Sequence, residues 1–149
     1  IADNCLPHID VFMPNGYTRE EMKMVNETRK ILGLPGLRVT ATTVRVPVFN
    51  SHSESINVEF EKQFDLKELM GVLEDAPGII VQDDPANSIY PMVINANGRD
   101  ETFVGRIRRD DSVEYGINMW VVADNIRKGA ATNAVQIAQE LVKWWNRQV

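Results

Sequence analysis

The stretch INVEFEKQFDLKELMGVLEDAPGIIV, residues 56–81, decides the fold class. Its opening residues alternate between apolar and polar side chains, which predicts a half-buried strand over 56–61. Asp65 then serves as a predicted N-cap for a helix with apolar side chains at helical spacing, and Pro77 ends that helix. Residues 78–81 are predicted to form another strand. This order of elements predicts a mixed β-sheet covered by helices, of the α+β or mixed α/β class.

The flanking sequence extends the same pattern in both directions. Thr18 and Glu21 have the spacing of a capping box, and Gly33 and Pro35 mark the end of the helix that they begin. The remaining predicted elements are strands over 37–48, 103–108 and 117–122, a loop over 82–101 and an amphipathic helix over 126–145. The chain has no internal repeat and no linker, so residues 1–149 are predicted to form a single domain.

Composition limits the classes of function. The chain has 149 residues, of which 44% are hydrophobic and 25% charged, as in a soluble globular protein. A net charge of −5 argues against binding nucleic acid, because phosphate contacts need a basic surface. No apolar run approaches the roughly 20 residues that a membrane span requires. We therefore expect neither a nucleic-acid partner nor a membrane partner.

The single cysteine indicates the cellular compartment of the protein, and the first residue indicates whether the chain has been processed. Cys5 is the only cysteine, which excludes an internal disulfide and a cysteine-based zinc site, and points to a reducing, cytoplasmic setting. Its neighbours include acidic and apolar residues and do not favour a reactive thiolate, so Cys5 is predicted to be a small buried residue. The chain starts at Ile1 without a leader, which suggests that it is processed or cut from something larger.

The two histidines differ in their surroundings. His8 follows a proline in an apolar N-terminal stretch and is expected to be structural. His52 lies in the polar segment 49–54, between two predicted strands, where acid–base groups are often placed. Surface loop histidines are also common, so the residues alone leave both interpretations of His52 open.

Three charged residues could bind an anionic or zwitterionic ligand. Arg45 stands alone within a β-branched stretch, where it is either a solvent-side residue or a planar group that grips a carboxylate. Glu20 and Lys23 are three apart on the predicted first helix, a spacing that by default indicates a solvated surface ion pair. No third ligand accompanies the His and acidic pairs, so we expect no metal site. The residues alone support a soluble α/β domain with a candidate anion-binding turn.

Several segments carry a resemblance to a known family. In chain order they are PHID at 7–10, GYTREEMKM at 16–24, ETRK at 27–30, RVPV at 45–48, SHSE at 51–54, VGRIR at 104–108, and Asp124-Asn125 followed by GAA at 129–131. Together they resemble the C-terminal region of the aspartate-semialdehyde dehydrogenases. The resemblance implies the dimerisation-domain fold shared by the semialdehyde and glyceraldehyde-3-phosphate dehydrogenases, and a homodimer.

The resemblance also implies an activity. Enzymes of this family convert β-aspartyl phosphate to aspartate semialdehyde with NADPH, on the route to lysine, threonine and methionine. A cysteine nucleophile and the main NADP site lie in an N-terminal domain. Neither that cysteine segment nor the dinucleotide loop is found here, so this chain alone should be inactive. Residues 126–149 would be a returning helix that packs on the missing nucleotide-binding domain.

The resemblance assigns roles to five residues. His52 matches the acid–base catalyst, Arg45 the group that binds the substrate carboxylate, and Lys23 a phosphate contact. Glu20 matches a further substrate-binding position, and Asn125 a position that touches the cofactor. Two alternatives remain: a stand-alone anion-binding and dimerisation module without catalysis, and the related N-acetylglutamyl-phosphate reductase.

Overall fold

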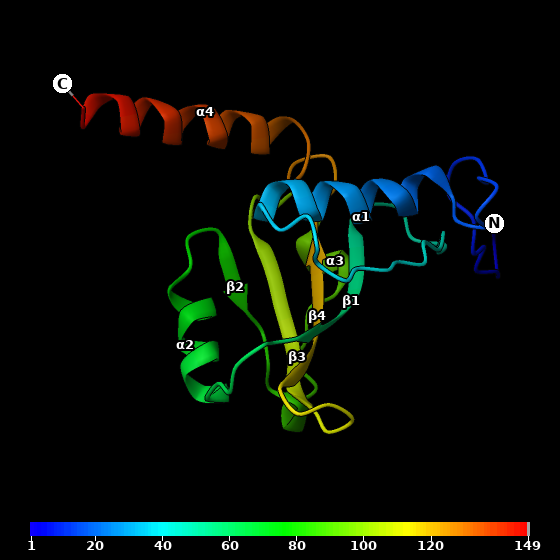
Figure 1. The fold of residues 1–149 in the computed structure, drawn as a ribbon, viewed down its shortest axis with the longest axis horizontal. Helices are drawn as coiled ribbons and strands as arrows, with labels where there is room; N and C mark the ends of the chain where they lie inside the picture. The colour runs from blue at the N-terminus through cyan, green and yellow to red at the C-terminus, as the bar shows by residue number, and fades with distance from the viewer. Residues whose placement is uncertain (149) are drawn as a thin grey trace. The chain divides into compact units, whose positions relative to one another are not determined.

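The computed structural model describes residues 1–148, which fall into two compact units. The N-terminal unit is Ile1–Val48 and the sheet unit is Phe49–Val149. Figure 1 shows the elements along the chain. In chain order these are α1 (Arg19–Leu32), β1 (His52–Glu59), α2 (Leu66–Asp75), β2 (Ile79–Val81), the short 3₁₀ helix η1 (Pro85–Asn87), α3 (Val93–Ala96), β3 (Thr102–Asp110), β4 (Gly116–Ala123) and α4 (Ala131–Asn146).

The first helix begins and ends where the sequence predicts. Thr18 Oγ1 accepts a hydrogen bond from the Glu21 N–H at 3.2 Å, and the Thr18 N–H donates to Glu21 Oε2 at 2.8 Å. This reciprocal pair is a capping box, and it satisfies N–H groups that the first turn of α1 would otherwise leave unpaired. At the other end, Gly33 adopts the left-handed conformation with φ of 67°. Both predicted signals are confirmed.

The strand predicted over 37–48 does not form. Within this segment the Arg45 backbone makes one isolated bridge with Leu6, and the Thr43 N–H donates to Glu21 Oε1 at 2.9 Å. A carboxylate and a single bridge therefore take backbone groups that a ladder would have used. The prediction was wrong because β-branched side chains favour a strand only where another strand lies alongside.

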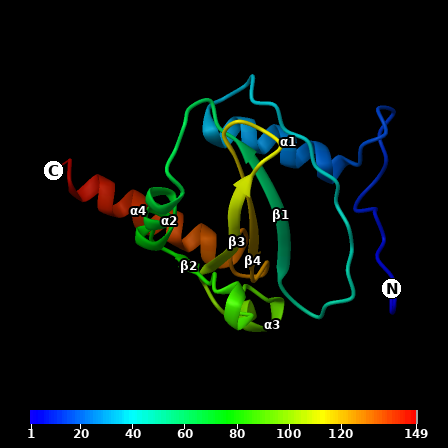
Figure 2. The ribbon, with the colours of Figure 1, turned by 90° about the horizontal axis from the view of Figure 1, so that it is seen from below.

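The sheet unit contains four strands in the order β1-β4-β3-β2. The pairs β1–β4 and β3–β4 are antiparallel, whereas β2 and β3 are parallel. The Asp65 side chain caps α2 as predicted, by accepting from the Glu68 N–H. Figures 1 and 2 show α2 beside β2 at one edge of the sheet and β1 at the opposite edge. The mixed sheet with helices confirms the predicted fold class.

The core of the sheet unit lies between the sheet and α3. Phe103 and Val122 are buried on adjacent strands, and Ala96 of α3 packs against them. Ile80, Val93 and Trp120 add partly buried apolar surface around this cluster. The segment 82–101, predicted as loop, thus includes η1 and α3, which the scattered prolines and asparagines concealed.

A bulge interrupts the pairing of β3 with β4. The register shifts between Gly105 and Arg108, and Arg106 takes a positive φ of 54°. Asp83 stabilises the bulge, because its two carboxylate oxygens accept from the Arg106 and Ile107 N–H groups, each at 2.9 Å. Gly105 is required at this point: a Cβ there would lie 2.1 Å from the carbonyl oxygen of Gln82.

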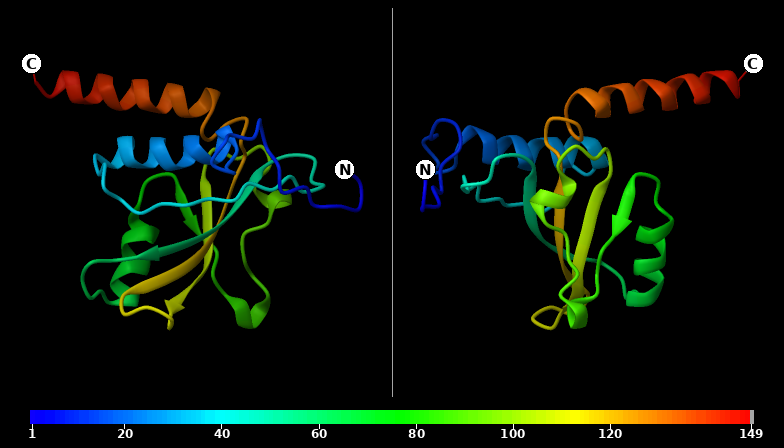
Figure 3. Two further views of the ribbon diagram at one scale, coloured as in Figure 1. Left: turned by 45° about the vertical axis from the view of Figure 1, so that its right-hand side comes forward. Right: turned by 180° about the vertical axis from the view of Figure 1, so that it is seen from behind.

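The last helix starts later than predicted and exposes its apolar side. Residues 125–130 form turns after β4, and α4 follows only from Ala131. Figure 3 shows this connection leading out of the sheet into α4. Val135, Leu141 and Trp145 are between 57% and 68% exposed, as expected for a helix whose apolar side lacks a covering layer. No described helix is both long and apolar enough to cross a membrane.

Candidate functional site

Glu20 and Lys23 form an ion pair on the first turn of α1. The Lys23 Nζ lies 3.1 Å from Glu20 Oε2, and both side chains remain accessible to solvent. The hydrogen bond to Glu20 raises the pKa of Lys23 above its usual value, which further favours the charged ammonium group. An adjacent carboxylate and ammonium can bind a zwitterion by opposing both of its charges. The structure therefore brings these two predicted substrate-binding residues together.

Arg45 lies in the same unit, on a segment held at two points. Its backbone N–H donates to the Leu6 carbonyl at 2.8 Å, and its carbonyl accepts from the Leu6 N–H at 3.0 Å. Two residues earlier, Thr43 is anchored to Glu21 of the α1 capping box. Because the backbone is held at Arg45 and two residues before it, the exposed Arg45 side chain extends from a defined position. A fixed guanidinium suits bidentate recognition of a carboxylate.

His52 and Glu54 form a second polar pair, in the sheet unit. His52 is the first residue of β1, whereas the sequence analysis placed it in a loop. Residues two apart on a strand share a face, and His52 Nε2 lies 2.8 Å from Glu54 Oε1. The hydrogen bond from His52 holds the pKa of Glu54 below its usual value. The carboxylate thereby orients the imidazole, an arrangement that suits proton transfer.

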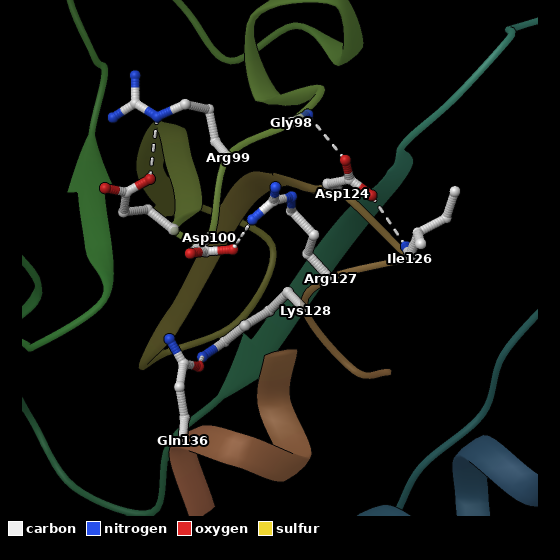
Figure 4. A network of polar contacts seen from close by, with 9 residues as sticks. Gly98, Arg99, Asp100, Asp124, Ile126, Arg127, Lys128 and Gln136 are labelled. Atoms are coloured by element: carbon white, nitrogen blue, oxygen red, sulfur yellow. Dashed lines mark hydrogen bonds and ion pairs between the residues drawn. The ribbon is translucent and has the colours of Figure 1, made fainter. Parts of the chain in front are cut away.

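Asn125 lies on the turn that joins β4 to α4. Its neighbours in the chain, Asp124 and Ile126 to Lys128, take part in a polar network (Figure 4). The preceding Asp124 is 3% exposed, and its carboxylate accepts hydrogen bonds from the backbone of Gly98 and of Ile126. Further along the turn, Arg127 pairs with Asp100. The Asn125 side chain itself is exposed. The structure thus places Asn125 on an anchored, solvent-facing turn.

His8 and Cys5 of the N-terminal segment, and the question of a metal site, complete the set of candidate residues. His8 stacks on Phe12 with ring centroids 4.4 Å apart and is exposed. Cys5 is exposed, not buried as predicted, because residues 1–5 have no covering layer of apolar side chains. Among residues 1–148, no three His, Cys, Asp or Glu side chains cluster in a way that could hold a metal ion.

Sequence reasoning missed a shallow groove on the sheet unit. Its volume is about 430 Å³, and it lies where the β3 bulge meets β4 and the segment before α3. Arg106 and Arg108, two apart on β3, were the available signal, but the segment before α3 that completes the groove was predicted only as loop. The principal lining residues are Tyr90, Met92, Arg106, Arg108, Met119 and Trp120.

Comparisons with known proteins agree with this fold. Residues 1–128 match the family described as "Semialdehyde dehydrogenase, dimerisation domain". The chain is 63% identical over 143 residues to an aspartate-semialdehyde dehydrogenase of Aquifex aeolicus. The matched region covers 96% of this chain and 42% of that relative. The chain therefore spans less than half the length of the curated relatives it matches.

Solved structures give the same result. The aspartate semialdehyde dehydrogenase II of Vibrio cholerae, described in a complex with ASA, is 53% identical with a TM-score of 0.90, over 96% of this chain and 42% of that one. The enzyme of Candida albicans, described with NADP, is 25% identical with a TM-score of 0.65, over 85% of this chain and 40% of that one. The family match covers most of the chain, and the structural match reproduces its fold. The chain belongs to the dimerisation-domain family of the semialdehyde dehydrogenases.

Proposed function

We propose that this chain supplies the substrate-binding residues, the acid–base histidine and the dimer interface of an aspartate-semialdehyde dehydrogenase. The observation that carries the proposal is the 63% identity to the Aquifex aeolicus enzyme across 96% of the chain. The reaction is the NADPH-dependent conversion of β-aspartyl phosphate to aspartate semialdehyde, in amino-acid biosynthesis. Such an enzyme would act in the cytoplasm.

The charges on the substrate match the side chains on this chain. β-Aspartyl phosphate carries a carboxylate, an ammonium group and a phosphate. Arg45 binds the carboxylate, because a guanidinium can meet both of its oxygens. Glu20 faces the ammonium group, and Lys23 the phosphate. The observed Glu20–Lys23 pair supports this assignment, since it offers both signs of charge on one helical turn.

His52 moves the proton in this proposal. It takes a proton from the thiol nucleophile of the nucleotide-binding domain and later returns one. A histidine suits both steps because its ordinary pKa of about 6.5 lies near physiological pH. The 2.8 Å contact with Glu54 supports the assignment, because it restricts the imidazole to a defined orientation.

Asn125 contributes to binding the cofactor, which in its reduced form, NADPH, would supply the hydride. The turn after Asn125 is open at Gly129, where an added Cβ would meet no atom within 4 Å. Most of the cofactor contacts belong to the nucleotide-binding domain. The role of this chain is to close one side of the cofactor site.

The sheet unit supplies the contact for a homodimer in this proposal. Twofold pairs present the same surface on both subunits, so the interface must be self-complementary. The sheet groove combines apolar Met119 and Trp120 with exposed Arg106 and Arg108. This mixture of apolar and cationic groups is typical of an interface surface. It agrees with the dimerisation role named in the matching family description.

The test replaces the matching segment of the Aquifex aeolicus relative with residues 1–149, which gives an enzyme of full length. We expect this chimera to reduce NADP⁺ only when both aspartate semialdehyde and phosphate are present. Activity on N-acetylglutamate semialdehyde instead would identify the related reductase. A folded, dimeric but inactive chimera would indicate a binding module and overturn the proposal.

A further inference from the structure

We propose that Asp124 is a positioning residue that holds Asn125 in place for the cofactor. The inference rests on the proposed function, because it takes from it the contact between Asn125 and NADP. It adds a residue for which neither the resemblance nor the composition suggests a role.

Asp124 joins two segments that are distant in the sequence. It follows β4 directly and is 3% exposed. Its Oδ2 accepts from the Gly98 N–H at 2.8 Å, and its Oδ1 accepts from the Ile126 N–H at 2.9 Å (Figure 4). One carboxylate oxygen therefore holds the loop after α3, and the other holds the residue that follows Asn125.

The carbonyl of the same residue fixes the rest of the turn. It accepts from the Arg127 N–H at 3.1 Å and from the Lys128 N–H at 2.8 Å. Asn125 thus lies inside a turn that Asp124 closes through both its side chain and its backbone. The far side of the turn is anchored by the Arg127–Asp100 pair and by the Lys128–Gln136 hydrogen bond.

The carboxylate is required in its ionised form. An ionised carboxylate accepts at both oxygens, whereas an asparagine amide accepts at one oxygen and donates at the nitrogen. The hydrogen bond from the Gly98 N–H, followed by that from Ile126, holds the pKa of Asp124 below its usual value. Asparagine at this position would leave either the Gly98 or the Ile126 N–H unpaired, and the turn would lose one of its two side-chain anchors.

This arrangement matters for function because Asn125 is exposed. The position of an exposed side chain depends largely on the backbone that carries it, here the backbone of the turn. A small displacement of a binding group can cost a large factor in activity. Loosening the turn should therefore weaken cofactor use and leave the substrate residues of the N-terminal unit unaffected.

The experiment is a double-mutant cycle in the full-length chimera, with Asp124→Asn, Asn125→Ala and the two combined. We expect Asp124→Asn to raise the KM for NADP⁺ by about ten-fold, with the KM for aspartate semialdehyde within about two-fold of the parent. In the Asn125→Ala background, Asp124→Asn should have no further effect on the NADP⁺ KM, because two residues that act through one contact are not additive.

The control is Asp84→Asn, which makes the same change in a carboxylate that caps η1 through the Asn87 N–H. It should leave the NADP⁺ KM unchanged. If Asp124→Asn does not fold, Asp124→Ser replaces it with the same expected result, since a serine hydroxyl can still accept from a backbone N–H nearby.

The outcomes separate this inference from the proposed function. Additive effects of Asp124→Asn and Asn125→Ala, in an active chimera, would overturn the positioning role and leave the enzyme assignment intact. An unchanged NADP⁺ KM in Asn125→Ala would overturn the inference together with the Asn125 assignment. A chimera without any activity would refute the proposed function and this inference with it.

Discussion

Gly105 offers a test of the sheet geometry, because alanine there should fit far worse than alanine at another glycine of the same unit. A Cβ at position 105 would lie 2.1 Å from the Gln82 carbonyl oxygen and 2.6 Å from Pro91 Cδ. Neither atom can move cheaply, since one is backbone and the other belongs to a ring. Gln82 is also tied to β3, where its N–H donates to the Val104 carbonyl at 2.8 Å.

The expected cost follows from this crowding. Adding a methyl group to a packed site typically costs 1–3 kcal/mol, and two rigid neighbours place Gly105→Ala at about 3 kcal/mol. Gly71→Ala is the matched control, because a Cβ at Gly71 within α2 meets nothing within 4 Å. In a helix this change should stabilise the fold by about 0.5–1 kcal/mol.

Urea unfolding of the purified chain, followed by circular dichroism, measures both variants. With a slope of about 2 kcal/mol per molar, Gly105→Ala should lower the midpoint by about 1.5 M, and Gly71→Ala should raise it slightly. A Gly105→Ala midpoint equal to that of the parent chain would refute the close approach of Gln82 and Pro91 to β3. An equal decrease of the urea midpoint in the two variants would show that the added methyl group does not destabilise the fold through crowding at Gly105.

Three further predictions concern the proposed roles. In the chimera, Arg45→Lys should raise the KM for aspartate semialdehyde strongly, because lysine keeps the charge but loses the planar fork; steady-state kinetics with an unchanged KM would exclude a bidentate contact. Lys23→Ala should raise the KM for phosphate more than that for NADP⁺, and an equal change in both would argue against a phosphate contact. Light scattering should find the chain dimeric at tens of micromolar, and a monomer there would contradict a stable interface.

Helix ends could be predicted correctly from sequence patterns that span only a few neighbouring residues. The capping box of Thr18 and Glu21, the left-handed Gly33 and the Asp65 cap each depend on contacts within one or two turns of helix. For these elements the sequence carries both partners of every interaction. The boundaries of α1 and α2 were therefore predictable.

Features that depend on distant partners could not be predicted in this way. The segment 37–48 has strand-like side chains, but its Thr43 N–H is taken by Glu21, 22 residues away. The contact of Asp124 with Gly98 could not be predicted, because Gly98 lies 26 residues earlier in the chain.

The candidate site shows the same division. The Glu20–Lys23 pair was readable from its helical spacing, and the structure confirms that the two side chains meet. The pairing of His52 with Glu54 could not be predicted from the sequence, because it requires both residues on one strand. The sequence predicted a turn at His52. The roles of these residues came from the resemblance to the family, not from their spacing.

The most direct test of the account compares the two histidines in the full-length chimera. His52→Asn should reduce kcat by a factor on the order of 10²–10⁴ while the KM for aspartate semialdehyde changes little, because asparagine hydrogen-bonds but cannot relay a proton. His8→Asn should leave kcat unchanged, since His8 only stacks on exposed Phe12. Loss of turnover in a folded His8→Asn enzyme, with normal kcat in His52→Asn, would contradict the account.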